Sequence, residues 1–272
     1  MNLIDGKALA EKIGEEVKTR VAGHNLSLGI ISIGQDLVSQ KFIEQKKKKG
    51  QELGIEVRTY QIPEGTSKHV RRAITDLIKK TDRDGYIIQL PLPEGLNTQY
   101  ILNSIPEMKD VDCLNQKNVG AFAVGRSPIL PPVIAAIDTI LKSRQIELEG
   151  KEIAVVGAGR LVGRPIIHWL TNSDLPFSVY TYHSSEQALN LKDADIIFTG
   201  TGRPNLIHAE MVKDGTILFD CGISIEEGNL SGDVDRKSME GKDGWLTPVP
   251  GGIGPLTVMH VFKNLTILKG LQ

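Results

Sequence analysis

The chain has 272 residues, of which 40% are hydrophobic and 24% charged, and its formal net charge is −1 at pH 7. This length suits two modest domains, and the intermixed charges leave no broad basic face for nucleic acid. The apolar stretches are too short to span a membrane, and residues 1–5 lack a signal-peptide layout. Cys113 and Cys221 lack metal-ligand spacing. We therefore expect a cytoplasmic protein with reduced thiols and no metal site.

The first third of the chain alternates between strand-like and helix-like patterns. Strands separated by helices of this length form right-handed crossovers, which favours a parallel sheet. The segment Gln89-Leu-Pro-Leu-Pro93 should end the third strand, because proline cannot donate a hydrogen bond to the ladder. We expect strands at 28–33, 55–60 and 85–89 and helices at 37–53 and 68–80.

A second alternating series follows, so two α/β domains are favoured over one. Helix and strand patterns lapse between Asp112 and Pro132, which places the domain boundary there. Residues 255–268 have the pattern of a closing helix that can return to the first domain. We expect helices at 132–144 and 166–171 and strands at 153–156, 177–180, 195–198 and 216–219.

The segment Gly157-Ala-Gly-Arg-Leu-Val-Gly-Arg-Pro165 lies between the expected strand at 153–156 and the helix after it. This order of strand, glycine turn and helix is typical of the phosphate site in a dinucleotide-binding fold. Gly157 would allow the tight turn, and Gly159 would let a pyrophosphate approach the free N–H groups of the helix. The spacing is one residue longer than the usual fingerprint, so an ordinary strand-to-helix turn is the alternative.

The residues near this turn bear on the choice of nucleotide. No acidic residue ends the strand before His183 and Ser184, although an acid there would bind the ribose hydroxyls of NAD. Arg160 and Arg164 lie beside the glycine turn, where they could accommodate a 2′-phosphate. The pattern favours NADP and leaves NAD open, because both arginines could simply be solvated. Gly200-Thr-Gly-Arg-Pro204 follows another strand and would lie beside the nicotinamide.

The expected helix at 37–53 has a face that combines polar, aromatic and basic residues. Ser39, Phe42, Lys46 and Lys49 share this face by three- and four-residue spacing. A lysine that faces a cleft can donate hydrogen bonds or, when its pKa is lowered, exchange protons. The positive charge of Lys49 would lower the pKa of Lys46. A solvated run of lysines is the alternative interpretation.

Two further segments have the composition of ligand-binding loops. In Lys109-Asp-Val-Asp112, Asp112 could hold a polar heterocycle through paired N–H groups, and Asp110 could cap a turn or stay solvated. The segment from Thr247 to Thr257 has glycines between prolines, so a flat ligand could approach its backbone closely. An ordinary turn and a domain-closing scaffold are the respective alternatives.

Taken in order, these segments resemble the bifunctional methylenetetrahydrofolate dehydrogenase/methenyltetrahydrofolate cyclohydrolase family over nearly the whole chain. Any one marker is weak, but the collinear set is highly specific. The markers are Ser39-Gln with Lys46, Asp84-Gly-Tyr-Ile-Ile-Gln-Leu-Pro-Leu-Pro93, Lys109-Asp-Val-Asp112, Asn118-Val-Gly120, Val162-Gly-Arg-Pro165, Gly232-Asp-Val-Asp235 and Thr247-Pro-Val-Pro-Gly-Gly-Ile-Gly-Pro255.

The resemblance implies a fold and two activities. The fold is two α/β domains around a cleft: a catalytic domain over residues 1–118, joined by the C-terminal helix at 255–272, and a Rossmann-like nucleotide-binding domain over 119–254. The reactions are NADP-dependent oxidation of 5,10-methylenetetrahydrofolate to the methenyl cation and hydration of that cation to 10-formyltetrahydrofolate. A homodimer through the nucleotide-binding domain is also implied.

The resemblance further assigns roles to residues. Lys46 would be the catalytic lysine of the hydrolytic step, Gln89 its hydrogen-bond partner, and Asp112 the anchor of the pterin edge. The expected folate-binding residues are Ser39, Phe42, Leu90, Pro91, Pro250, Gly251, Gly252 and Ile253. The expected nucleotide-binding residues are Gly157, Ala158, Gly159, Arg160, Leu161, Val162, Gly163, Arg164, His183, Ser184, Thr201, Gly202 and Ile223.

The chain also departs from the family pattern. Phe42 replaces a usual tyrosine, and Pro131-Pro-Val-Ile-Ala-Ala136 replaces a usual Pro-Cys-Thr-Pro-x-Gly. Ala158 and Ser185 stand where basic residues are common, which weakens the preference for NADP. We expect the missing hydroxyl at position 42 to affect proton handling more than hydride transfer. The alternatives are a dehydrogenase without hydrolytic activity, a non-catalytic folate- or nucleotide-binding protein, and a dehydrogenase for another small substrate.

Overall fold

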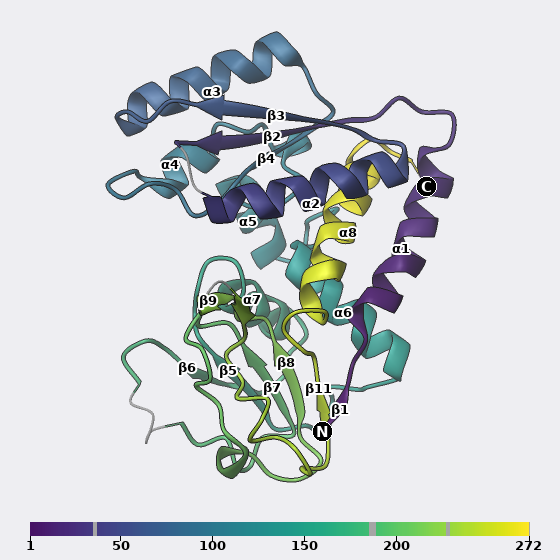
Figure 1. Cartoon of the computed structure of the whole chain (residues 1–272), viewed down its shortest axis with the longest axis vertical. Helices are drawn as coiled ribbons and strands as arrows, with labels where there is room; N and C mark the ends of the chain where they lie inside the picture. The colour runs from purple at the N-terminus through teal and green to yellow at the C-terminus, as the bar shows by residue number, and fades with distance from the viewer. Residues whose placement is uncertain (35–36, 185–188, 227–228, 272) are drawn as a thin grey trace. The chain divides into compact units, whose positions relative to one another are not determined.

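The two-domain α/β architecture expected from the sequence is confirmed by the computed structural model of the chain (Figure 1). Each unit is built on a parallel sheet that carries helices. The structure describes residues 1–34, 37–184, 189–226 and 229–271, and the side chains of residues 37–42 and 226 lie outside this description.

Contacts between Cα atoms divide the chain into two compact units, which we name after their sheets. The three-strand unit comprises Lys12–Pro132 and the chain from Val258 onward, and the six-strand unit comprises Met1–Glu11 and Val133–Thr257. This grouping returns the C-terminal segment to the N-terminal sheet, as the expected division does. It differs by assigning the first eleven residues to the six-strand unit and by changing unit after Pro132 instead of after residue 118.

The sheet of the three-strand unit is parallel, with β2 in the centre. Its isoleucines are almost completely buried, which is typical of parallel strands that helices cover. The connections run through two helices, as the sequence predicts. The order of strands is β3 (Glu56–Ile62), β2 (Ser27–Ile33) and β4 (Gly85–Ile88), and the connecting helices are α2 (Leu37–Leu53) and α3 (Ser67–Thr81).

Local sequence explains why α3 forms where it does. The Thr66 hydroxyl caps the first turn by accepting a hydrogen bond from a backbone N–H. Val70, Ile74 and Ile78 recur every four residues and are buried in one core with the isoleucines of the sheet. Asp82 ends the helix in a left-handed conformation with a φ of 43°.

The sheet of the six-strand unit is also parallel, and a separate two-stranded antiparallel sheet is formed by β9 (Ser224–Glu226) and β10 (Asn229–Ser231). The expected strand, glycine turn and helix around residue 157 are present as β5 and α7 (Gly163–Asn172). Helix α6 (Pro132–Arg144) precedes them. The order of strands is β1 (Asn2–Leu3), β11 (Trp245–Leu246), β8 (Ile217–Asp220), β7 (Ile196–Thr199), β5 (Ile153–Val156) and β6 (Ser178–Tyr180).

The expectation that helices lapse between Asp112 and Pro132 is wrong, because α5 (Gln116–Ala123) lies there. The Asn115 side chain caps this short helix, and Phe122 anchors it in the interior. A helix of eight residues shows too few turns for its apolar period to stand out in the sequence. The structure also contains α1 (Gly6–Val21), α4 (Thr98–Leu102) and short 3-10 helices at Glu107–Lys109 and Ala209–Met211, and its last helix is α8 (Ile253–Leu268).

The described parts of the chain contain neither a membrane-spanning helix nor a metal-binding cluster. No helix there is long and apolar enough to cross a membrane. Among the same residues, no three His, Cys, Asp or Glu side chains are grouped so that they could hold a metal ion. Cys113 and Cys221 are free and buried.

Candidate active site

Lys46 and Gln89 meet beyond the carboxyl end of β4, beside Asp112. Lys46 projects from α2, Gln89 directly follows β4, and Asp112 follows the 3-10 helix at Glu107–Lys109. Lys46 Nζ donates a 2.9 Å hydrogen bond to Gln89 Oε1. Gln89 Nε2 donates at 2.8 Å to the carbonyl of Leu90, which directs the amide oxygen toward the lysine. The fold therefore brings the three expected catalytic residues together in one cluster.

The environment of this cluster disfavours charge. Burial lowers the pKa of the Lys46 ammonium below its ordinary value, and the Asp112 carboxylate acts in the opposite direction. Burial likewise raises the pKa of Asp112, against the attraction of Lys46. A lysine in such a site can exchange protons more readily than one in water. The expectation that Lys49 lowers this pKa is wrong, because Lys49 pairs with Glu52 at 2.6 Å and burial is the main cause.

Asp110 supports the loop that presents Asp112. The sequence left open whether Asp110 caps a turn or stays solvated, and the structure shows it only 1% exposed. Its carboxylate accepts hydrogen bonds from the backbone N–H of Asn115 at 2.7 Å and from Asn118 Nδ2 at 3.0 Å. Burial raises the pKa of Asp110 to about 6, although these hydrogen bonds oppose the rise. Asp110 is therefore a structural anchor that ties the marker Lys109-Asp-Val-Asp112 to the marker Asn118-Val-Gly120.

The remaining expected folate-binding residues of the three-strand unit are only partly described. Leu90 packs against the core of the unit, the Leu90–Pro91 peptide is cis, and Pro91 is exposed. Ser39 and Phe42 belong to α2, but their side chains lie outside the described residues. Their contribution to folate binding stays a prediction.

The segment from Pro250 to Ile253 belongs to the six-strand unit. The Val249–Pro250 peptide is cis, and Gly251 has a φ of 110°. The Gly251 carbonyl accepts a 3.0 Å hydrogen bond from the N–H of Gly6, and a Cβ on Gly6 would overlap the carbonyl of Gly252. The backbone of this segment therefore packs directly on the start of α1, before α8 begins at Ile253. Its role in binding folate stays a prediction.

The glycine turn after β5 borders a cavity of about 330 Å³ within the six-strand unit. Gly157 has a φ of 98°, and a Cβ there would lie 2.8 Å from the carbonyl oxygen of Gly200. A Cβ on Gly163 would overlap the carbonyl of Gly157. Both positions therefore require glycine, and they leave backbone rather than side chains at the start of α7, as binding of a pyrophosphate requires.

The expected nucleotide-binding residues divide into two groups around this cavity. Those that line it come from the glycine turn and from the loops after β6 and β7, so three separate loops converge. The lining group is Gly157, Ala158, Gly159, His183, Ser184 and Thr201. The residues outside the lining are Arg160, Leu161, Val162, Gly163, Arg164, Gly202 and Ile223.

Sequence reasoning missed several lining residues. Tyr182 lies in the loop that directly follows β6, so its position at a strand end could have identified it. Arg203 also lines the cavity, and it belongs to the segment Gly200–Pro204 that was expected beside the nicotinamide. Leu189 and Leu206 lie further along the chain, where no pattern distinguishes a lining leucine from a core leucine. Ala158 lines the cavity where the family resemblance predicts a basic residue, and none of the described residues that line the cavity is acidic.

Comparisons with known proteins cover both units. Residues 4–112 match the catalytic domain model of tetrahydrofolate dehydrogenase/cyclohydrolase, and residues 131–270 match its NAD(P)-binding domain model. The chain is 36% identical over 271 residues to the bifunctional protein FolD of Nautilia profundicola, covering 97% of this chain and 95% of that one. It is 33% identical over 264 residues to FolD of Caldanaerobacter subterraneus, covering 96% and 94% respectively.

Solved structures give the same result. The FolD methylenetetrahydrofolate dehydrogenase/cyclohydrolase of Campylobacter jejuni matches with a TM-score of 0.91 and 35% identity, covering 99% of each chain. The Trypanosoma brucei enzyme, solved with NADP cofactor and an inhibitor, matches with a TM-score of 0.91 and 28% identity, covering 98% of this chain and 97% of that one. This chain therefore belongs to the tetrahydrofolate dehydrogenase/cyclohydrolase family.

Proposed function

We propose that this chain catalyses two consecutive reactions of one-carbon metabolism. The first is oxidation of 5,10-methylenetetrahydrofolate to the methenyl cation with NADP, and the second is hydrolysis of that cation to 10-formyltetrahydrofolate. Matches to both domain models and to relatives named bifunctional support the pair of activities. The observation that carries the proposal is the half-buried Lys46, hydrogen-bonded to Gln89 beside Asp112, because it supplies a proton-transfer group.

The dehydrogenase step depends on positioning. NADP supplies the hydride acceptor, and no protein acid or base is required for that transfer. The task of the chain is to hold the nucleotide in one orientation, which the backbone of the glycine turn and the loops around Thr201 would do. The described residues that line the cavity include no acidic side chain, which fits a 2′-phosphate, and His183 and Ser184 supply polar groups there.

The hydrolytic step requires proton transfer. Water adds to the methenyl carbon, the bond from that carbon to one ring nitrogen breaks, and one proton leaves to solvent overall. Neutral Lys46 can take a proton from the attacking water and, as an ammonium, return a proton to the departing nitrogen. Gln89 holds the amine by accepting its hydrogen bond. Asp112 would anchor the pterin by accepting paired N–H groups, and its negative charge keeps the pKa of Lys46 from falling further.

The decisive experiment supplies purified protein with 5,10-methylenetetrahydrofolate and either NADP or NAD. Formation of the methenyl product and its decay are followed separately. We expect reduction of NADP followed by decay faster than in buffer alone. Decay at the buffer rate would favour the alternative of a dehydrogenase without hydrolytic activity. No product with either nucleotide, in protein that is folded by circular dichroism, would favour a binding protein.

We also propose that the protein is a cytoplasmic homodimer. The resemblance to the family supports the dimer, and the free, buried thiols of Cys113 and Cys221 fit a reducing compartment. Light scattering coupled to size-exclusion chromatography measures the molar mass in solution. A mass equal to that of one chain at working concentration would contradict the dimer.

A further inference from the structure

The marker Gly232-Asp-Val-Asp235 has no role in the reactions described above. Its first acid, Asp233, is completely buried in the six-strand unit. Asp233 Oδ2 accepts two short hydrogen bonds, one from the Thr199 hydroxyl at 2.6 Å and one from the backbone N–H of Thr201 at 2.6 Å. These donors lie at the end of β7 and in the loop directly after it. A single carboxylate oxygen therefore fixes the path of the chain where it leaves β7.

That path forms one wall of the nucleotide cavity. Gly200 and Thr201 line the cavity together with the glycine turn. The carbonyl of Gly200 lies close enough to Gly157 that a Cβ there would come within 2.8 Å of it. The N–H of Gly200 donates a 2.9 Å hydrogen bond to the carbonyl of Val156. A shift of the loop after β7 would therefore be transmitted to the turn that receives the pyrophosphate.

Asp233 is itself held in one orientation. Its backbone N–H donates a 3.1 Å hydrogen bond to Asp220 Oδ1, and the N–H of Val234 donates at 3.0 Å to Asp220 Oδ2. Gly222 adjoins the Asp233 carboxylate so closely that a Cβ there would overlap Oδ1. Burial raises the pKa of Asp220 to about 7, and the neighbouring Asp233 carboxylate contributes to the rise. Burial of two neighbouring acids lowers the stability of the fold, and such destabilising groups are typical of functional sites.

The second carboxylate oxygen of Asp233, Oδ1, shows that this residue destabilises the fold. Asp233 Oδ1 is buried and has no hydrogen-bond partner among the described residues. A buried acceptor without a partner is destabilising, so stability alone would favour a neutral side chain at this position. The benefit of a carboxylate at this position therefore lies in the two hydrogen bonds that Oδ2 accepts from Thr199 and Thr201.

We propose that Asp233 is a positioning residue for the dehydrogenase step. Its carboxylate holds the loop from Gly200 to Gly202 in the shape that receives the nucleotide, and it acts through Thr201 without touching the substrate. The affinity for NADP then depends on Asp233, whereas hydrolysis of the methenyl cation does not. This inference rests on the proposed function, because it assigns the cavity to NADP.

The test compares Asp233→Ala and Asp233→Asn with the wild-type enzyme. Alanine removes both accepted hydrogen bonds, so we expect the KM for NADP and its dissociation constant by calorimetry to rise by about tenfold or more. Asparagine can still accept from both donors through a neutral oxygen, so it should restore most of the affinity. The hydrolysis rate and the KM for folate should stay within about twofold of wild type in both variants.

Asp235→Ala is the matched control, because Asp235 belongs to the same marker but its carboxylate contacts other residues than Thr199 and Thr201. Its carboxylate pairs with His208 at 3.7 Å and accepts a 3.0 Å hydrogen bond from the N–H of Lys237. We expect unchanged affinity for NADP in this variant.

Parallel loss of hydrolysis and NADP binding in Asp233→Ala, or unchanged binding, would overturn the inference. If alanine prevents folding, Thr199→Val decides the question: it removes the hydroxyl that donates to Asp233 Oδ2, so it must weaken NADP binding at least severalfold while hydrolysis persists. A wild-type enzyme without either activity would instead overturn the proposed function.

Discussion

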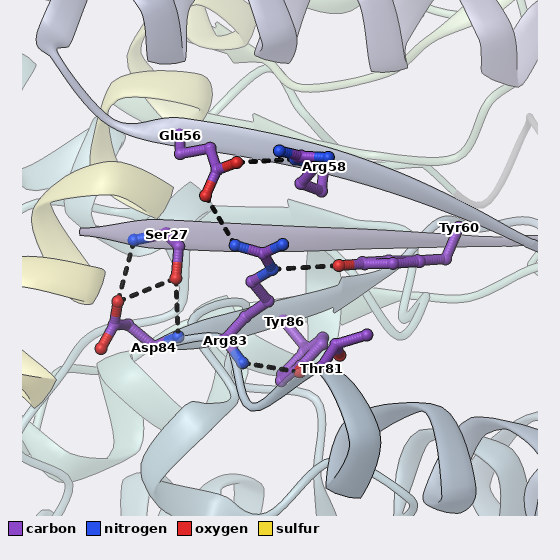
Figure 2. A network of polar contacts seen from close by, with 8 residues as sticks. All are labelled: Ser27, Glu56, Arg58, Tyr60, Thr81, Arg83, Asp84 and Tyr86. Atoms are coloured by element: carbon purple, nitrogen blue, oxygen red, sulfur yellow. Dashed lines mark hydrogen bonds and ion pairs between the residues drawn. The ribbon is translucent and has the colours of Figure 1, made fainter. Parts of the chain in front are cut away.

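Polar groups at the two ends of the sheet in the three-strand unit differ in how well they are paired. At the amino end, a network of eight polar residues is drawn together around Arg83 and Asp84 (Figure 2). The Arg83 guanidinium donates to the Tyr60 hydroxyl at 3.0 Å and to a Glu56 oxygen at 2.6 Å. Asp84 accepts from both the N–H and the hydroxyl of Ser27 at 2.9 Å. Each charge at this end has an opposite charge or several hydrogen bonds.

At the carboxyl end, Lys46 donates a hydrogen bond to the neutral side chain of Gln89, and its surroundings disfavour the ammonium. Asp112, which could neutralise it, is itself desolvated. The same sheet therefore carries a satisfied polar network at one end and a destabilised one at the other. The amino end therefore serves stability, whereas the carboxyl end keeps desolvated groups available for proton transfer.

The most severe test of this contrast is Lys46→Met. Loss of the proton-transfer group should slow hydrolysis by about 10²–10⁴-fold, while the free energy of unfolding stays constant or increases because a desolvated amine is removed. Urea denaturation and the decay of the methenyl substrate measure the two effects. Lys49→Met is the control, since Lys49 lies on the same helix and pairs with Glu52. Equal loss of hydrolysis in both variants would contradict the assignment.

The pH dependence of hydrolysis tests whether Lys46 is the group that transfers the proton. The Asp112 carboxylate favours the charged form of Lys46, so Asp112→Asn should lower the pKa of Lys46 further. The rising limb of the pH–rate profile, which reports the neutral amine, should therefore move to lower pH. Measuring the rate at saturating folate separates this shift from weaker binding of the pterin. A limb that stays in place or moves to higher pH would mean that Lys46 is not the titrating group.

At the amino end, removing one buried hydroxyl should affect stability alone. The Tyr86 hydroxyl bonds Thr81 Oγ1 at 2.7 Å and accepts from the N–H of Arg83 at 2.8 Å, and the ring is fully buried. Tyr86→Phe removes the acceptor of the Arg83 N–H, whereas Thr81 keeps its hydrogen bond to the Leu77 carbonyl, and the free energy of unfolding should fall by about 1–3 kcal/mol. Tyr60→Phe, at a partly exposed hydroxyl, should cost less. A loss of either activity at a temperature where the variant is folded would argue against a purely structural role.

Sequence reasoning predicted the elements with strong periodicity and missed those that tertiary contacts define. The helix expected at 37–53 and the strand expected at 153–156 have the bounds that the structure shows. Strands β1 and β11 have two residues each and exist only because they extend an existing sheet, so no local pattern could reveal them. Helix α1 was missed although Ile13, Val17 and Val21 recur every four residues and are buried.

In the candidate site, too, the sequence predicts which residues matter, whereas tertiary contacts determine their environment. The resemblance indicated Lys46, Gln89 and Asp112, and their spacing along the chain could not show how desolvated the lysine is, because burial depends on the packing of other elements. Likewise, Asp233 and Asp235 are two acids of one marker. Only the folded structure distinguishes the buried carboxylate that binds the cavity loop from the acid that pairs with His208.

A partly exposed ion pair lies at the amino end of the sheet, where Lys269 Nζ pairs with Asp84 Oδ1 at 2.9 Å. Burial opposes ionisation of Asp84, but hydrogen bonds from Lys269 and Ser27 outweigh it, so the pKa of Asp84 falls below its ordinary value of 3.8. A depressed carboxyl pKa stabilises the folded state above the unfolded pKa, and this contribution is lost as the pH falls through the folded pKa.

Lys269→Met should therefore lower the free energy of unfolding by about 0–1 kcal/mol at pH 7. The difference from wild type should shrink in 1 M salt and disappear as Asp84 becomes protonated near and below pH 3.8. Urea titrations at pH 7 and at acidic pH measure this difference. The sign is the informative result: removal of a lysine should weaken the fold at the amino end and spare or strengthen it at the carboxyl end. If Lys269→Met and Lys46→Met changed stability in the same direction, the contrast between the two ends of the sheet would fail.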